Sequence, residues 1–150
     1  MRTAAAFGQV VSILLRAEPY RSMCIADLEW LIVPAIATGQ YAVAARSSEA
    51  TGVSAPVGVV LWASVSEVVA AKFAQTPAEQ IVRPGPQDWQ SGEIVWIIDA
   101  IGDATVIGSF MQDLRKNHWP NRDVRLRTRG KDGHMHVMPL PLVPAQSAGM

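Results

Sequence analysis

Apolar side chains recur with helical spacing near the start of the chain. Residues 4–15 carry them at i, i+3, i+4, i+7 and i+8, which predicts an amphipathic helix. A second helix is predicted between Asp27, placed to cap or charge its start, and Gly39, placed to end it. Pro34 lies inside this second segment, and we expect it to kink the helix because proline lacks the N–H donor of the helical ladder.

Two further helical segments follow later in the chain. Ser64 or Ser66 is placed to cap a third helix, whose apolar positions run from Val65 to Phe73. Asp103 offers a cap to a fourth helix, which has one apolar face over residues 106–114.

Strand-forming residues fill much of the rest of the chain. Two hairpins are predicted: 40–46 with 56–63, joined across 47–55, and 124–127 with 134–138, joined by a turn at 131–133. Between them, 94–98 is a continuous β-prone apolar run, which is typical of a strand buried on both faces. Asp99 is predicted to lie where this strand stops.

The elements follow the order ααββαβαββ, without an internal repeat. We expect one α/β domain over residues 1–138 and a disordered proline-containing tail over residues 139–150. The length of 150 residues, with 49% hydrophobic and 17% charged side chains, suits a single hydrophobic core.

Charge and cysteine content narrow the function classes. Thirteen basic and thirteen acidic residues balance, so no overall field favours nucleic acid. The lone Cys24 excludes an intramolecular disulfide and allows a reducing compartment, with the cytoplasm as the default. No run reaches the roughly 18 to 20 apolar residues of a membrane span, although peripheral membrane contact stays open.

Other polar clusters have structural as well as functional readings. His134 and His136 would share one side of a strand, as a metal pair requires, but no third ligand is apparent nearby, so we expect no metal site. Arg125, Arg127 and Arg129 could form a solvated face or a dock for an acidic carrier protein.

Three segments together resemble the RTX toxin-activating lysine acyltransferases, the haemolysin-C-like family. They are LIVPAIATGQY (31–41), PVGVVLWA (56–63) and DWQSGEIVWIID (88–99), and their order and spacing also match. The resemblance extends from about Phe7 to about Val137.

This resemblance implies a mixed β-sheet flanked by helices, similar to the GCN5-type N-acyltransferases. It also implies that acyl-acyl carrier protein donates a fatty acyl group to lysines of an RTX-type protoxin in the cytoplasm, with no bound cofactor. Family members resemble dimers, which leaves a homodimer open for this chain.

Within the family, catalysis is attributed to a histidine in the loop after the first helix and an aspartate after the Trp-x-Ser-Gly motif. Asp99 matches the aspartate, whereas Tyr20 occupies the position of the histidine. A phenol is a poor base near neutral pH, but it can donate a proton to a departing thiolate while Asp99 accepts the amine proton. The residues that the resemblance assigns to substrate binding are Arg21, Trp89, Ser91 and Gly92.

Tyr20 and Arg21 could also have purely structural roles. The Tyr20 ring could pack on the rim of the core, and Arg21 could pair with Glu18. Two alternative functions follow: a non-catalytic relative that binds carrier protein or toxin, and an N-acyltransferase that acts on a small amine with a coenzyme A thioester.

Overall fold

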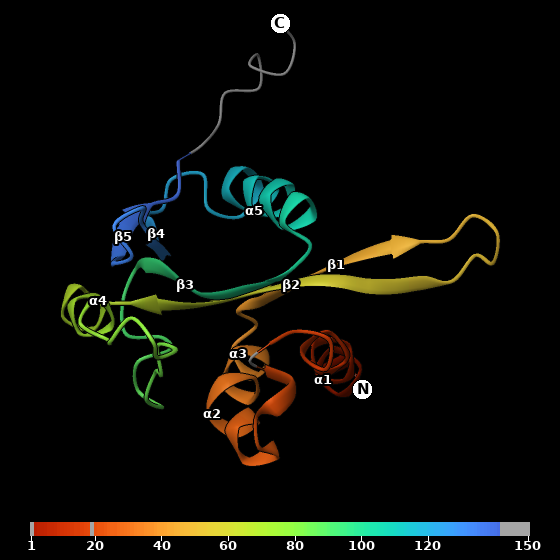
Figure 1. Ribbon diagram of the computed structural model, residues 1–150, viewed down its shortest axis with the longest axis horizontal. Coiled ribbons are helices and arrows are strands. Elements are labelled where there is room, and N and C mark those ends of the chain that lie inside the picture. The colour runs from red at the N-terminus through yellow and green to blue at the C-terminus, as the bar shows by residue number, and fades with distance from the viewer. Residues whose placement is uncertain (1, 19, 142–150) are drawn as a thin grey trace, which may run out of the picture.

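A computed structural model describes residues 2–18 and 20–141 of the chain (Figure 1). Its helices are α1 (Arg2–Leu14), η1 (Tyr20–Ser22), η2 (Ile25–Asp27), α2 (Leu28–Leu31), α3 (Val33–Ala37), α4 (Glu67–Ala74) and α5 (Ala104–Asn117). Its strands are β1 (Tyr41–Ser47), β2 (Ser54–Val65), β3 (Ile94–Gly102), β4 (Val124–Arg129) and β5 (Met135–Pro139). With α2 and α3 taken as one broken helix, the predicted order of elements is confirmed.

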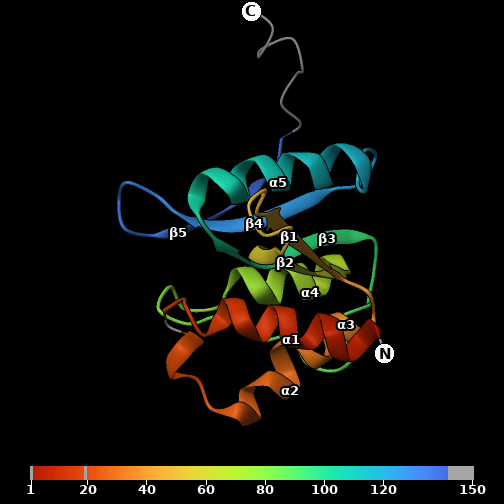
Figure 2. The ribbon, with the colours of Figure 1, turned by 90° about the vertical axis from the view of Figure 1, so that its right-hand side faces the viewer.

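The strands form one five-stranded sheet in the order β1-β2-β3-β4-β5. All neighbours are antiparallel except β3 and β4, which are parallel because α5 carries the chain back between them. Helix α5 covers one face of the sheet, and α1, α2, α3 and α4 lie on the other (Figure 2). This mixed sheet with helices on both faces is consistent with the GCN5-type N-acyltransferase fold.

Strand β3 separates two hydrophobic cores, as its unbroken apolar run predicts. Trp96 and Ile98 pack into the core with α1, α3 and α4, whereas Val95 and Ile97 pack into the core beneath α5. Successive side chains of a strand point to opposite faces, so a strand covered on both faces must be apolar at every position.

The prediction that the strand stops at Asp99 is wrong, because β3 continues to Gly102. Its pairing with β2 shifts register between Leu61, opposite Asp99, and Trp62, opposite Ile97, so β3 carries one extra residue there. The continuous apolar run ends at Ile98, but the pairing with β2 continues to Gly102, which lies opposite Gly58. Asp99 is therefore a polar residue inside a strand, immediately after a β-bulge.

The second predicted helix is broken into two short pieces at Ile32, and Pro34 lies in the first turn of α3. Proline is tolerated there because first-turn N–H groups have no intrahelical partner. Ser66 caps the third helix through the Val69 N–H, and Val65, which was expected in this helix, ends β2 instead.

Strands β3 and β4 pair only at their beginnings, where Val95 lies opposite Val124 and Trp96 opposite Arg125. Beyond Trp96, the described part of the chain shows no further pairing between these two strands. Strand β5 ends at Pro139, and Leu140 packs on the core beneath α5. The rest of the predicted tail, residues 142–150, lies outside the described residues.

Candidate active site

Asp99 and Tyr20 lie far apart in the sequence but line one cavity of about 420 Å³. Strand β3 supplies Asp99, and the single turn η1 after α1 supplies Tyr20. The remaining lining residues are Ala17, Glu18, Ile81, Ala100, Ile101 and Gly102. We call this space the Asp99–Tyr20 cavity.

Tyr20 is 7% exposed and belongs to the core cluster on the α1 side of the sheet. Its ring packs against the core, as the structural role considered for Tyr20 predicts. Its hydroxyl makes no hydrogen bond with any residue that the structure describes. A phenol O–H is both a donor and an acceptor, so it offers both functions to a ligand that reaches it.

Arg21 follows Tyr20 but does not line the Asp99–Tyr20 cavity. Its Nε lies 3.6 Å from Oε1 of Glu18, and both side chains are more than half exposed. The predicted pairing with Glu18 is confirmed, although an exposed ion pair of this kind contributes little to stability.

Burial raises the pKa of Asp99 from its ordinary value of 3.8 to about 6. The Ala100 N–H, 2.8 Å from Oδ1, opposes this shift by donating to the charged form. Among the described residues, no cation forms an ion pair with Asp99. A carboxylate with a pKa near 6 is mostly ionised at neutral pH and is a stronger base than an ordinary aspartate.

A second cavity, of about 320 Å³, opens where β3 and β4 separate. Ile97, Ile98 and Asp99 line it from β3, and residues 78–82 line it from the segment between α4 and β3. We call it the strand-gap cavity. Ile81 and Asp99 line both cavities, so the two spaces adjoin at these residues.

The arginines of β4 already have partners inside the molecule. Arg127 donates to the carbonyl oxygens of Thr76 and Gln80, and Arg129 donates to those of Gly133 and Ala78. Arg127 and Arg129 thus hold the segment after α4 beside the strand gap, and both line the strand-gap cavity.

Arg125 differs from the other two arginines because its partners are carboxylates. It pairs with Glu67 at 2.9 Å and with Asp123 at 2.7 Å, and these partners raise its pKa further above its ordinary value. Its guanidinium therefore joins the start of β4 to the start of α4. The sequence signals the positive charge of this strand, but it does not signal that the charge serves contacts within the chain.

The Trp-x-Ser-Gly motif joins the end of β2 to the start of β3. The Ser91 hydroxyl donates to the Asp88 carbonyl at 2.9 Å and accepts from the Ser66 N–H at 3.2 Å. A Cβ at Gly92 would lie 2.5 Å from the Val65 carbonyl oxygen, so the close approach of the two segments needs glycine. Ser91 and Gly92 do not line either cavity at Asp99, and their binding of substrate stays a prediction.

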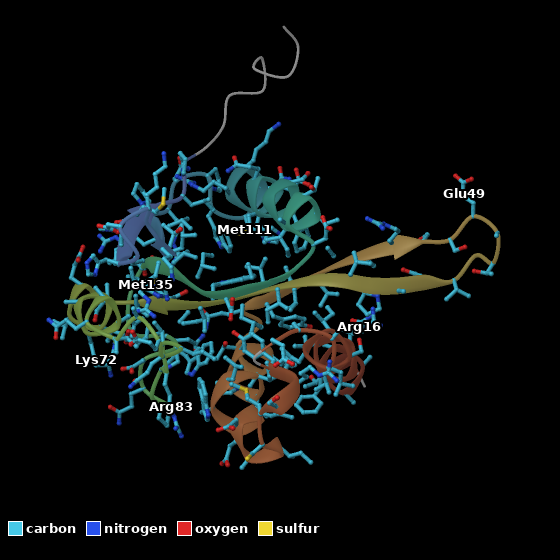
Figure 3. The ribbon with its side chains drawn as sticks, viewed as in Figure 1. Arg16, Glu49, Lys72, Arg83, Met111 and Met135 are labelled. Carbon is cyan, nitrogen blue, oxygen red and sulfur yellow. The ribbon has the colours of Figure 1, made fainter. Side chains whose placement is uncertain are left out.

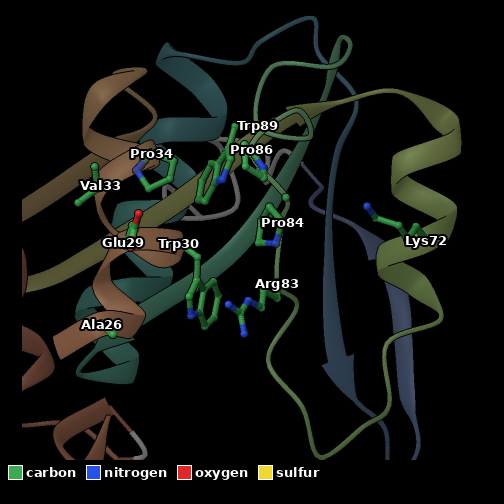
Figure 4. Close-up of a pocket in the computed structure, with 11 residues that line it drawn as sticks. Ala26, Glu29, Trp30, Val33, Pro34, Lys72, Arg83, Pro84, Pro86 and Trp89 are labelled. Carbon is green, nitrogen blue, oxygen red and sulfur yellow. The ribbon is translucent and has the colours of Figure 1, made fainter. Parts of the chain in front are cut away.

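Trp89 lines a separate cavity of about 670 Å³ between α2–α3 and residues 83–86 (Figure 4). Trp30 and Arg83 lie together at its wall, with the guanidinium 4.9 Å from the ring centroid. Trp89 is 2% exposed and its Nε1 has no hydrogen-bond partner in the described structure. This larger cavity contains neither Asp99 nor Tyr20.

Two buried polar residues that the sequence did not point to, Gln40 and Asp88, form hydrogen bonds around Trp89 and the segment before it. Gln40 donates to the Trp89 carbonyl at 2.9 Å and accepts from the Ser64 hydroxyl at 2.7 Å. Burial pulls the pKa of Asp88 upward, but Lys72 at 2.6 Å and the Gly85 N–H outweigh it and hold the pKa below its ordinary range. Gln40 is part of the Gln-Tyr pair in the 31–41 segment, which is the only signal that the sequence offers for it.

Residues 2–18 and 20–141 contain no group of three or more His, Cys, Asp and Glu side chains arranged to hold a metal ion. His136 pairs instead with Asp132 at 3.1 Å in the exposed turn between β4 and β5. In the same part of the chain, no helix combines the length and the apolar character that crossing a bilayer requires.

Comparison with known proteins adds a family to this geometry. No curated protein matches the chain. The profile of the RTX toxin acyltransferase (HlyC) family matches residues 1–138. This range includes β1 to β4, all of β5 except Pro139, and all residues that line the two cavities at Asp99. The chain therefore belongs to the RTX toxin acyltransferase family.

Proposed function

We propose that this chain is a protein-lysine acyltransferase that moves a fatty acyl group from acyl-acyl carrier protein to lysines of an RTX-type protoxin in the cytoplasm. One observation carries the proposal: Asp99, a half-buried aspartate with a raised pKa, lines two cavities and shares one of them with Tyr20, whose hydroxyl has no hydrogen bond to the described residues. Membership of an acyltransferase family supplies the reaction class.

The Asp99–Tyr20 cavity suits the amine acceptor. A lysine ammonium must lose a proton before its nitrogen can attack a thioester, and in this proposal Asp99, which lines the cavity, accepts it. The apolar lining from Ile81 and Ile101 also favours the neutral amine, because desolvation lowers the pKa of a lysine.

The strand-gap cavity suits the thioester donor. Beyond Trp96, the edge of β3 that faces β4 lacks a strand partner in the described residues, so its backbone groups can pair with the amides of a pantetheine arm. Ile97, Ile98 and Met135 offer apolar surface for an acyl chain. Asp99 borders both cavities, so donor and acceptor would meet beside it.

Proton transfer then divides between two residues. The lysine ammonium gives one proton to Asp99, and the neutral amine attacks the thioester carbon. As the C–S bond breaks, Tyr20 donates its proton to the leaving thiolate, and the tyrosinate takes the second amine proton. The products are an amide, a thiol and a protonated Asp99 that releases its proton to water.

The second candidate is a non-catalytic relative that binds carrier protein or toxin. The observation that favours it is Tyr20, which stands in the position of the family histidine and has its ring packed in the core. In this case the cavity at Asp99 would still bind a partner, but the chain would lack the histidine needed for proton transfer.

The deciding experiment incubates the full chain with palmitoyl-acyl carrier protein and a lysine-containing fragment of an RTX protoxin. Intact-mass spectrometry should show the fragment heavier by one acyl group, with the adduct on a lysine. Tight carrier binding with no adduct would favour the non-catalytic relative. An adduct on a small amine supplied with a coenzyme A thioester, but not on the fragment, would assign the small-molecule activity.

A further inference from the structure

Two acidic residues, Glu18 and Asp99, line the Asp99–Tyr20 cavity, and its lining among the described residues includes no lysine or arginine. Asp99 is half-buried, whereas the Glu18 side chain is 66% exposed. The cavity therefore has one acidic side chain that is mostly exposed to water and a second that is half-buried. Tyr20 is an independent observation that points to a ligand, because this residue is only 7% exposed, lines the cavity and has a hydroxyl with no hydrogen bond to any described residue.

Glu18 has a weak partner that a ligand can replace. Its Oε1 lies 3.6 Å from Nε of Arg21, and the Arg21 side chain is itself 62% exposed. Water screens a pair of this kind, so exchanging Arg21 for another cation costs little free energy. Glu18 has no other ion pair among the described residues.

We propose that Glu18 is the residue that selects a cationic acceptor: its carboxylate binds the lysine ammonium at the exposed side of the cavity and delivers it to Asp99. This inference rests on the proposed function in taking a lysine as the acceptor. Glu18 binds the charged form, and Asp99 removes the proton afterwards, so the two carboxylates act at different stages. Neither the sequence pattern nor the family motif singles out Glu18.

A binding experiment without any acyl donor tests this proposal. The probes are a glycine- and serine-flanked peptide with one lysine and the same peptide with norleucine in its place, each carrying a neutral fluorophore. Fluorescence anisotropy gives the Kd of each peptide for the full chain. Glu18→Gln should weaken binding of the lysine peptide by about two- to five-fold and leave the norleucine peptide unchanged.

Two further variants sharpen the result. Glu49→Gln makes the same chemical change at the tip of the β1–β2 hairpin, far from α1 and its neighbours (Figure 3), and should alter neither Kd. Arg21→Gln removes the competing cation and should keep or strengthen the preference for lysine. If Arg21→Gln weakened lysine binding as much as Glu18→Gln does, the proposal would be wrong.

Other outcomes also decide the matter. A parent chain that binds no lysine peptide, or a Glu18→Gln variant that binds it as tightly as the parent, overturns the role of Glu18. Lysine binding that depends on Glu18, in a chain that transfers no acyl group to the protoxin fragment, would instead remove the proposed function and leave the inference in place.

Discussion

At the scale of single residues, the raised pKa of Asp99 links activity to stability. The folded chain binds this proton up to a pH of about 6, whereas an unfolded chain releases it near 3.8. Between these values the folded state carries more protons, so the free energy of unfolding falls as the pH rises. Above pH 6 the protein bears the full cost of an ionised carboxylate in a poorly hydrated place.

Asp99→Asn should therefore stabilise the protein while it abolishes acyl transfer. Urea unfolding at pH 7.5 should show a free energy of unfolding higher by about 2 to 3 kcal/mol, because the buried charge is gone. At pH 3.5 most of the advantage should vanish, since Asp99 is then largely protonated in both the folded and the unfolded state. Equal stability of variant and parent at pH 7.5 would contradict the raised pKa.

Tyr20→Phe separates chemistry from packing. The phenol hydroxyl has no hydrogen bond in the described structure, so its removal should change the melting temperature by less than about 2 °C. Acyl transfer should fall by about 100-fold or more if the hydroxyl protonates the leaving thiolate. A variant as active as the parent would rule this role out, and Tyr20→His tests whether the residue expected by the family raises the rate.

At the scale of elements, local patterns predicted what local interactions determine. Helix spacing, the Ser66 and Asp103 caps and both hairpin turns follow from neighbours in sequence, and the structure confirms them. The end of β3 could not be predicted in this way, because pairing with β2, and not hydrophobicity, carries the strand past Asp99.

The candidate site shows the same division. The family motif predicted Asp99 as a site residue, and alignment with the family's histidine position added Tyr20; the fold brings both to one cavity. Ile81 could not be found, because only the chain path after α4 brings it beside Asp99. The position of Ser91 was equally hidden, since its partners lie in the turn before β3 and at the end of β2.

The junction between β2 and β3 can be tested with a pair of glycines. A Cβ at Gly92 would meet the Val65 carbonyl oxygen and the Ser66 N–H at 2.5 Å, and backbone atoms cannot move aside cheaply. Gly92→Ala should lower the free energy of unfolding by about 1 to 3 kcal/mol. Gly108→Ala is the matched control, because that helical position has no atom within 4 Å of a new Cβ.

The control should shift in the opposite direction. Gly108 lies within α5, where alanine is favoured over glycine by about 0.5 to 1 kcal/mol. Thermal unfolding of the two variants beside the parent chain provides the comparison. A Gly92→Ala variant as stable as the parent would show that the close packing at the motif is not required.

At the scale of the whole molecule, two separate spaces adjoin strand β3 at Asp99. The strand-gap cavity lies between the diverging strands, and the Asp99–Tyr20 cavity lies between β3 and the turn after α1. A reaction of two substrates benefits when each has its own approach and their reacting atoms meet at one carboxylate.

This arrangement predicts that each substrate can be obstructed separately. Ala17 lines the Asp99–Tyr20 cavity and Ala78 lines the strand-gap cavity, and only the backbone carbonyl of Ala78 binds Arg129. Ala17→Phe should raise the KM for the protoxin fragment several-fold and leave that for the acyl donor near its parental value. Ala78→Phe should do the reverse, because its ring would enter the space proposed for the thioester. Initial rates with each substrate varied in turn, on variants whose melting temperatures match the parent, measure both constants.

If both substitutions raised the KM of the same substrate, donor and acceptor would share one entrance, and the two-sided arrangement would have to be abandoned.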